Sequence, residues 1–198
     1  MKNLTPSPLV VLQAATPPQW LDVCQSHLPE LLSDHAHCER KAAASALSLI
    51  SRAPSDTTLV TAMAALAREE AGHLQRVHRE MVQRGWPLQS DRKDDYVLAL
   101  RAHIRKGRTS QLMEELLVAC LIEARSAERL GLLAEGLQDE GLRRLYRDLA
   151  GCEAGHATLF FERAQAASPD EAEDSLQEWL RHEAEVVRGL PVTPRIHG

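Results

Sequence analysis

The sequence predicts an all-α protein: a four-helix bundle with one long crossover connection and extra short helices. Alanine and leucine dominate the apolar content, whereas aromatic residues make up only 4% of the chain, and this bias favours helices over strands. Four long stretches repeat apolar residues every three or four positions, which is the spacing of a helix with one buried face. The chain has 198 residues, enough for one domain with a hydrophobic core, so we expect a single domain over 1–198.

The expected elements follow one another with recognisable boundaries. Residues 1–18 are rich in proline and should form an irregular N-terminal segment. Pro54 and Asp56 mark the end of one helix and the N-cap of the next, and Gly85 and Pro87 stop the second helix. The predicted long helices cover 29–52, 56–84, 109–136 and 138–167, followed by a final helix at about 170–188 and a loose tail at 189–198.

The connection between the second and third long helices differs from the others. Residues 85–108 are too many for a simple turn, so we expect them to cross the length of the bundle and to include a short helix around 94–106. Two short connections and one long crossover are typical of a ferritin-like bundle. The predicted fold is therefore a single ferritin-like domain.

Each long helix carries a glutamate near the middle of its apolar face. In the second helix, for example, Leu66, Glu70 and His73 continue the apolar spacing. A buried carboxylate costs several kcal/mol unless it is paired or binds a metal. Four such groups at one level would repel one another in a dry core, and two bound multivalent cations would remove that repulsion. The four glutamates are Glu39, Glu70, Glu123 and Glu153.

The tetrapeptide Glu-Ala-Gly-His occurs twice, at 70–73 and at 153–156. Its Glu and His side chains, three positions apart, point to one face of a helix. The two halves of the chain repeat the spacing, with 31 residues from Glu39 to Glu70 and 30 from Glu123 to Glu153. One Glu-x-x-His is common by chance, but the whole pattern matches the di-iron or di-manganese carboxylate arrangement. It predicts a dinuclear metal site with the ligands Glu39, Glu70, His73, Glu123, Glu153 and His156.

Other features limit the possible functions. The formal net charge of −5 argues against a general attraction to nucleic acid, but a basic cluster in the crossover could bind phosphates, or could equally be a solvated helix face. We find no run of ~18 apolar residues and no signal peptide, and we expect no membrane contact and a cytoplasmic location. No pair of cysteines forms the Cys-x-x-Cys of zinc knuckles. The candidate RNA-binding residues are Arg101, Arg105, Lys106 and Arg108.

Four segments resemble the MiaE family of non-haem di-iron tRNA hydroxylases. They read DHAHCERKAAASAL, LAREEAGHLQRV, LLVACLIEARSAERL and LAGCEAGHATLFFERA, and the similarity covers about 20–190. The resemblance implies that the six predicted ligands hold two iron ions and that O2 is a co-substrate. It also implies oxygen insertion at the terminal allyl carbon of the isopentenyl chain on a hypermodified adenosine beside the anticodon. The partners would be tRNA and an electron-donor protein, such as an external reductase. We expect the protein to be a monomer or a small homo-oligomer.

Two other interpretations remain open. The chain could be a different ferritin-like di-metal oxidase, peroxidase or catalase that acts on small molecules, or a non-enzymatic metal-storage bundle. Storage would require a shell-forming oligomer. Around the predicted ligands, we expect His35 and Tyr146 to pack in the core, with an auxiliary role possible for His35, and Arg125 could pair with a ligand carboxylate.

Overall fold

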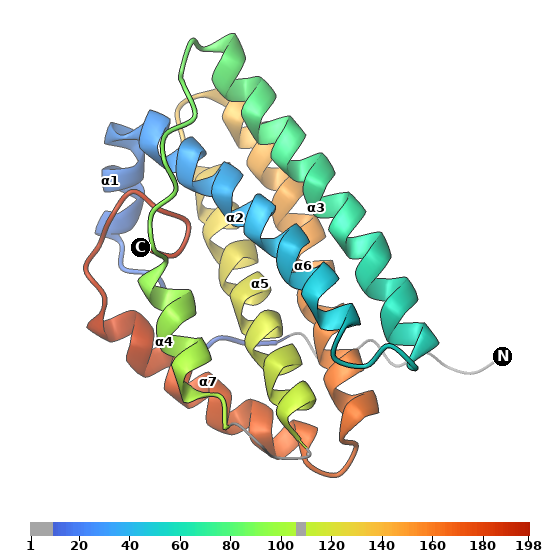
Figure 1. The fold of residues 1–198 in the computed structure, drawn as a ribbon. Coiled ribbons are helices and arrows are strands. Elements are labelled where there is room, and N and C mark those ends of the chain that lie inside the picture. Colours follow the sequence, from blue (N-terminus) through green and yellow to red (C-terminus); the bar gives the residue numbers. More distant parts are fainter. Residues whose placement is uncertain (1–9, 106–109) are drawn as a thin grey trace, which may run out of the picture.

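The computed structural model describes residues 10–105 and 110–198, and all regular structure in them is helical (Figure 1). The all-α prediction is therefore confirmed. The long helices begin and end within three residues of the predicted positions, whereas the first short helix was not predicted. The helices are α1 (Gln19–Ser26), α2 (Leu28–Ile50), α3 (Thr57–Gln83), α4 (Asp95–His103), α5 (Gln111–Gly136), α6 (Glu140–Ala167) and α7 (Ala172–Gly189).

Helices α2, α3, α5 and α6 form the bundle, as two hairpins. Helix α2 packs mainly against α3, and α5 packs mainly against α6. The crossover from α3 to α5 contains α4, which lies beside α7 and α5 on the outside of the bundle (Figure 1). This is the ferritin-like arrangement that the connection lengths predicted. None of the helices in the described part of the chain combines the length and the apolar character that a membrane span requires.

Three helices begin at aspartates whose side chains accept hydrogen bonds from backbone amides of the first turn. Asp56 accepts from Thr58 and Leu59, and Asp94 and Asp139 each accept one such bond. These N-caps satisfy amides that have no partner inside the helix. Asp94 is thereby fixed at the start of α4, and its second carboxylate oxygen lies 2.8 Å from His197 Nδ1.

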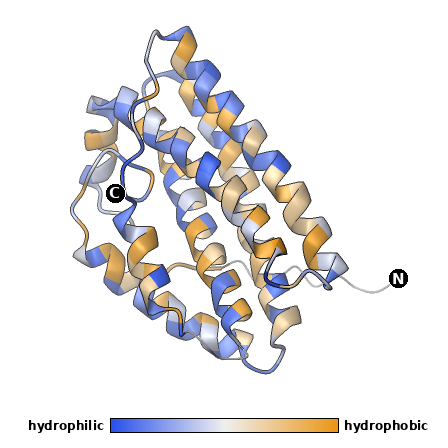
Figure 2. Cartoon of the chain, viewed as in Figure 1, coloured by the Kyte–Doolittle hydropathy of each residue, from blue (hydrophilic) through white to orange (hydrophobic). Residues whose placement is uncertain are grey.

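The core is divided into two apolar clusters. Along α3, Met63 and Leu66 belong to one cluster, whereas Val77 and Met81 belong to the other. Glu70 and His73 lie between these pairs along the helix and are also buried. Figure 2 shows apolar residues along the long helices, interrupted by polar positions. The bundle therefore contains a polar layer between two apolar halves.

The segment 189–198 is packed against the bundle, so the prediction of a loose tail was wrong. Ile196 is only 1% exposed. The Arg195 Nε donates a hydrogen bond to Asp34 Oδ1 at 2.7 Å. Arg129 Nη1 donates to the Ile196 carbonyl oxygen at 2.8 Å. These partners are distant in sequence, and a short segment with glycine and two prolines carries no local signal for them.

Candidate metal centre

The six predicted ligands meet in the polar layer of the bundle. Each long helix contributes at mid-height, and each of α3 and α6 contributes a glutamate and a histidine one turn apart. None of the six is more than 7% exposed. They are Glu39 on α2, Glu70 and His73 on α3, Glu123 on α5, and Glu153 and His156 on α6.

The side chains form two groups, in each of which the potential ligand atoms lie within 4.8 Å of one another. One group contains Glu39 and His73, and the other contains Glu123 and His156. Glu70 and Glu153 belong to both groups. Two shared carboxylates, with one further glutamate and one imidazole on each side, are the donor set that could hold a pair of metal ions.

The two imidazoles face the shared carboxylates in the same way. His73 Nδ1 lies 3.2 Å from Glu70 Oε2 and 3.4 Å from Glu153 Oε1. His156 Nδ1 lies 2.8 Å from Glu70 Oε1 and 3.2 Å from Glu153 Oε2. This equivalence follows from the internal repeat, because both Glu-x-x-His motifs approach from opposite hairpins.

Protons on the buried groups offset part of the negative charge of this cluster. Burial disfavours the imidazolium of His156, but the carboxylates of Glu153 and Glu70 raise its pKa to about 10. Burial also disfavours the imidazolium of His73, but hydrogen bonds to Glu153, Glu39 and Glu70 together raise its pKa. Burial and the nearby Glu153 raise the pKa of Glu123 well above its usual range. Metal ions bind deprotonated ligands, so binding must release these protons and metal affinity must fall as the pH decreases.

Of two residues near the cluster, His35 contacts one of the candidate ligands, whereas Arg125 does not. His35 Nε2 lies 2.6 Å from Glu39 Oε1, and its ring stacks on Tyr146 with 5.5 Å between centroids. Burial raises the pKa of Glu39, but hydrogen bonds led by that from His35 bring it below its usual range. His35 therefore holds Glu39 in place in addition to packing in the core. Arg125 points away from the cluster, to Glu183 on α7, with 2.7 Å between Nη2 and Oε1.

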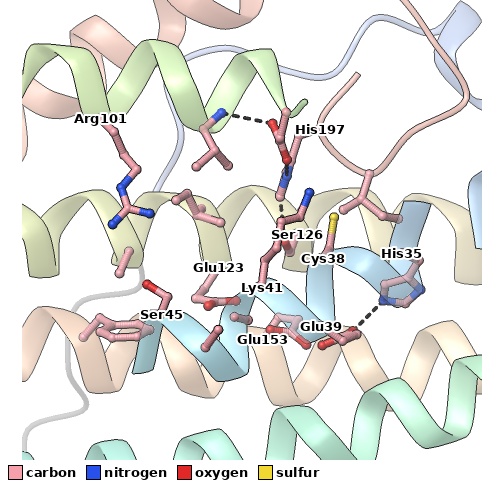
Figure 3. A pocket seen from close by; sticks show the side chains of 18 of the residues that line it. His35, Cys38, Glu39, Lys41, Ser45, Arg101, Glu123, Ser126, Glu153 and His197 are labelled. Atoms are coloured by element: carbon pink, nitrogen blue, oxygen red, sulfur yellow. Dashed lines mark hydrogen bonds and ion pairs between the residues drawn. The ribbon is translucent and has the colours of Figure 1, made fainter. Parts of the chain in front are cut away.

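A cavity of about 360 Å³ opens beside the cluster, between α2 and α5 (Figure 3). Its wall includes three of the candidate ligands, Glu39, Glu123 and Glu153. Much of the remaining wall is apolar, with side chains that include Ala42, Ala119, Val97, Ile122 and Phe160. A molecule in this cavity would contact both these candidate ligands and the apolar wall.

The structure separates the candidate RNA-binding residues. Arg101 on α4 lines the cavity, and Figure 3 shows it at one end, on the side of Ser45. Arg105 instead forms an ion pair with the fully buried Glu114, with 2.5 Å between Nε and Oε1. Lys106 and Arg108 lie outside the described residues. Of the two candidates that the structure describes, Arg101 lies at the cavity and Arg105 does not.

Sequence reasoning missed the polar contribution of the C-terminal segment to this cavity. Ile196 and His197 line it, together with Ser126 on α5. Ser126 carried a signal, because it continues the apolar spacing of its helix three positions after Glu123. His197 carried none, since only the folded chain brings it to the bundle.

Comparisons with known proteins agree with this geometry. The tRNA 2-(methylsulfanyl)-N(6)-isopentenyladenosine(37) hydroxylase of Pseudomonas putida is 39% identical over 154 residues, which cover 78% of this chain and 75% of that protein. The Salmonella typhimurium hydroxylase of the same name is 27% identical. The match covers 92% of this chain and 84% of the Salmonella protein.

A solved structure gives the same fold. It is described as "Protein 43 with aldehyde deformylating oxygenase activity from Synechococcus" and superimposes with a TM-score of 0.89. The two sequences are 37% identical, over 94% of this chain and 95% of that chain. A family model described as "MiaE: tRNA-(MS[2]IO[6]A)-hydroxylase (MiaE)" matches residues 3–198. The ferritin-like fold, the repeated Glu-x-x-His pattern and this match together show that the chain belongs to the MiaE family of tRNA hydroxylases.

Proposed function

We propose that this protein hydroxylates the isopentenyl side chain of a hypermodified adenosine next to the tRNA anticodon. The observation that carries the proposal is the largely apolar cavity whose wall includes Glu39, Glu123 and Glu153. The relatives named as hydroxylases of that nucleoside support the choice of substrate. A tRNA substrate supports a cytoplasmic location, and we expect a monomer or small homo-oligomer.

We assign the six buried glutamates and histidines as ligands of two iron ions. When bound, such a pair supplies the O2 chemistry that no protein side chain provides by itself. In the overall reaction one oxygen atom enters a C–H bond and the other leaves as water. The balance requires two electrons and two protons, so an external electron-donor protein is a necessary partner. The ligands are Glu39, Glu70, His73, Glu123, Glu153 and His156.

The cavity walls have two tasks in this proposal. The apolar side chains of Ala42, Ala119 and Phe160 would bind the five-carbon chain and exclude water from the reacting end. The size of about 360 Å³ lies within the range of small-molecule sites and suits a prenyl chain with part of its base. The isopentenyl chain is thus expected to enter the cavity end-on, with the anticodon loop outside the cavity.

The direct test uses tRNA that carries the isopentenyl group but lacks the hydroxyl. Iron-loaded protein with a reductant and O2 should convert this nucleoside to one heavier by a single oxygen atom, measured by nucleoside mass analysis. Matched tRNA without the isopentenyl group should remain unchanged. An unaltered isopentenyl nucleoside after full reduction and aeration would reject the proposed function.

A second candidate activity is oxygenative deformylation of an aldehyde. The name of the similar Synechococcus structure favours it, and an apolar cavity would also admit an alkyl chain. The same iron-loaded preparation should therefore be given aldehydes of increasing length, with formate as the measured product. We expect no formate above the level of iron-free protein, and rapid formate release with unchanged tRNA would favour this alternative.

We expect Arg101→Ala to weaken tRNA binding. Arg101 is exposed on α4 and lines the cavity, where it is available to a phosphate of the anticodon loop. Loss of one phosphate contact should lower the affinity several-fold and reduce the slope of log affinity against log salt by about one. Arg144→Ala, at an exposed position of α6, is the matched control. Equal affinities and salt slopes for both variants and the wild type would exclude Arg101 from the RNA interface.

A further inference from the structure

The C-terminal segment is a fixed wall of the cavity. The carboxylate of Asp34 accepts hydrogen bonds from Arg195 Nε at 2.7 Å and from the Ile196 amide at 2.8 Å. Arg129 Nη1 donates to the Ile196 carbonyl, and Trp20 Nε1 donates to the Arg195 carbonyl at 3.1 Å. Helices α1, α2 and α5 therefore all hold the backbone that precedes His197.

His197 links two polar groups of the cavity wall. Its Nδ1 lies 2.8 Å from Asp94 Oδ2, and its Nε2 lies 3.1 Å from Ser126 Oγ (Figure 3). Its ring also stacks on Tyr96, with 5.1 Å between centroids. Asp94, Ser126 and His197 are each at most 9% exposed, and all three line the cavity. The result is a buried chain of hydrogen bonds that ends at a serine hydroxyl.

The chemistry of the three groups determines which atom donates in each of these hydrogen bonds. A carboxylate only accepts hydrogen bonds, so Asp94 requires the hydrogen of His197 on Nδ1. In a neutral imidazole, Nε2 is then an acceptor, and the Ser126 hydroxyl donates to it. The oxygen of Ser126 can therefore offer only lone pairs to a molecule in the cavity. Cys38 also lies near Asp94 and His197, but a metal ion bound there would displace the hydrogen bond of whichever imidazole nitrogen it coordinates.

We propose that Ser126, oriented by His197 and Asp94, accepts a hydrogen bond from the N6–H of the modified adenosine. This inference rests on the proposed function. An alkylated N6 carries one hydrogen and is the point where the isopentenyl chain is attached. The Ser126 oxygen is thus the acceptor that selects a nitrogen-linked chain and fixes how deeply it enters.

The spacing along α5 fits this role. Ser126 follows Glu123 by three residues, which corresponds to a rise of about 4.5 Å along a helix. An extended isopentenyl chain spans about 5 Å from N6 to its terminal carbon, as estimated from ordinary bond lengths. With N6 at the level of Ser126, the terminal carbon reaches the level of Glu123 and the other candidate ligands.

The test compares two anticodon stem-loop RNAs that differ in one atom. One carries the isopentenyl chain on N6, and the other carries it on an oxygen at the same position, which has no hydrogen to donate. Binding is measured at pH 8, where histidine side chains are ordinarily neutral, with iron-loaded protein kept free of O2. The wild type should prefer the nitrogen-linked RNA by about three- to tenfold, the usual contribution of one neutral hydrogen bond.

Two variants should remove this preference for different reasons. Ser126→Ala deletes the acceptor, whereas His197→Ala frees the serine hydroxyl to donate to the oxygen-linked RNA. In both, the two affinities should agree within about twofold. Ser45→Ala is the matched control, because Ser45 lines the same cavity without a hydrogen bond to His197, and it should keep the preference.

The outcomes separate this inference from the proposed function. If wild-type protein hydroxylates tRNA but binds both RNAs equally, or if Ser126→Ala keeps the preference, the role of Ser126 is rejected and the proposed function stands. If the wild type does not hydroxylate the tRNA, both are rejected. His197→Ala alters no helix of the bundle, so it tests the inference even if Ser126→Ala fails to fold.

Discussion

Glu70→Ala should abolish stoichiometric metal binding and reduce hydroxylation by at least about a hundredfold. Glu70 belongs to both groups of potential ligand atoms, so its loss removes an oxygen donor from each proposed ion. Changes to groups that merely support metal ligands already cost about 10–100-fold, and a shared ligand should cost more. The helices should remain folded, because one carboxylate fewer reduces the repulsion within the buried cluster.

The measurement is iron per chain after anaerobic loading and removal of free metal, together with far-ultraviolet circular dichroism. Glu39→Ala provides a graded comparison, since Glu39 belongs to only one group and one ion should be retained more firmly than the other. Glu135→Ala, at an exposed position near the end of α5, is the surface control. Full iron loading and turnover in the Glu70 variant would remove this residue from the ligand set.

Ala119→Phe should suppress hydroxylation without loss of iron. Ala119 lies on α5 one turn before Glu123 and lines the cavity, so an aromatic ring at this position would occupy space assigned to the substrate. Misplacement of a reacting group by about 1 Å can cost about a hundredfold in rate, and exclusion of the chain should cost at least as much. The affinity for tRNA as a whole should change less, because phosphate contacts such as that proposed for Arg101 do not require entry of the isopentenyl chain.

The comparison requires two matched variants. Ala119→Ser changes the cavity little and should retain most of the turnover. Ala65→Phe adds the same ring at an exposed position of α3 and should behave as wild type. Undiminished hydroxylation by Ala119→Phe, with the protein folded and iron-loaded, would show that the substrate reaches the metal centre by another route.

The sequence was sufficient to predict the bundle and its six candidate ligands because both depend on local periodicity. Glu70 and His73 share a helix face by spacing alone, and the near-equal separations of the two halves placed the four glutamates at one level. Glu70 and His73 lie between Met63 and Val77 on α3, and the other four candidate ligands lie between apolar residues of their own helices. The burial of all six follows from these positions. Such local patterns can be recognised in the sequence without knowledge of contacts between distant residues.

The features that were missed depend on contacts between different elements of the fold. Arg125 follows Glu123 closely, yet it pairs with Glu183, 58 positions away along the chain. Arg105 belongs to a basic run, yet it pairs with the buried Glu114. His197 reaches the cavity only because Asp34, Arg129 and Trp20 hold its neighbours. Composition and spacing cannot report such pairings, since each partner looks like an ordinary surface residue.

The position of Ile196 and His197 in the cavity wall separates two properties of the chain. Every candidate ligand lies on the four bundle helices, whereas these two residues lie outside them. A change in this segment should therefore alter which molecules the cavity admits and leave the candidate ligands in place.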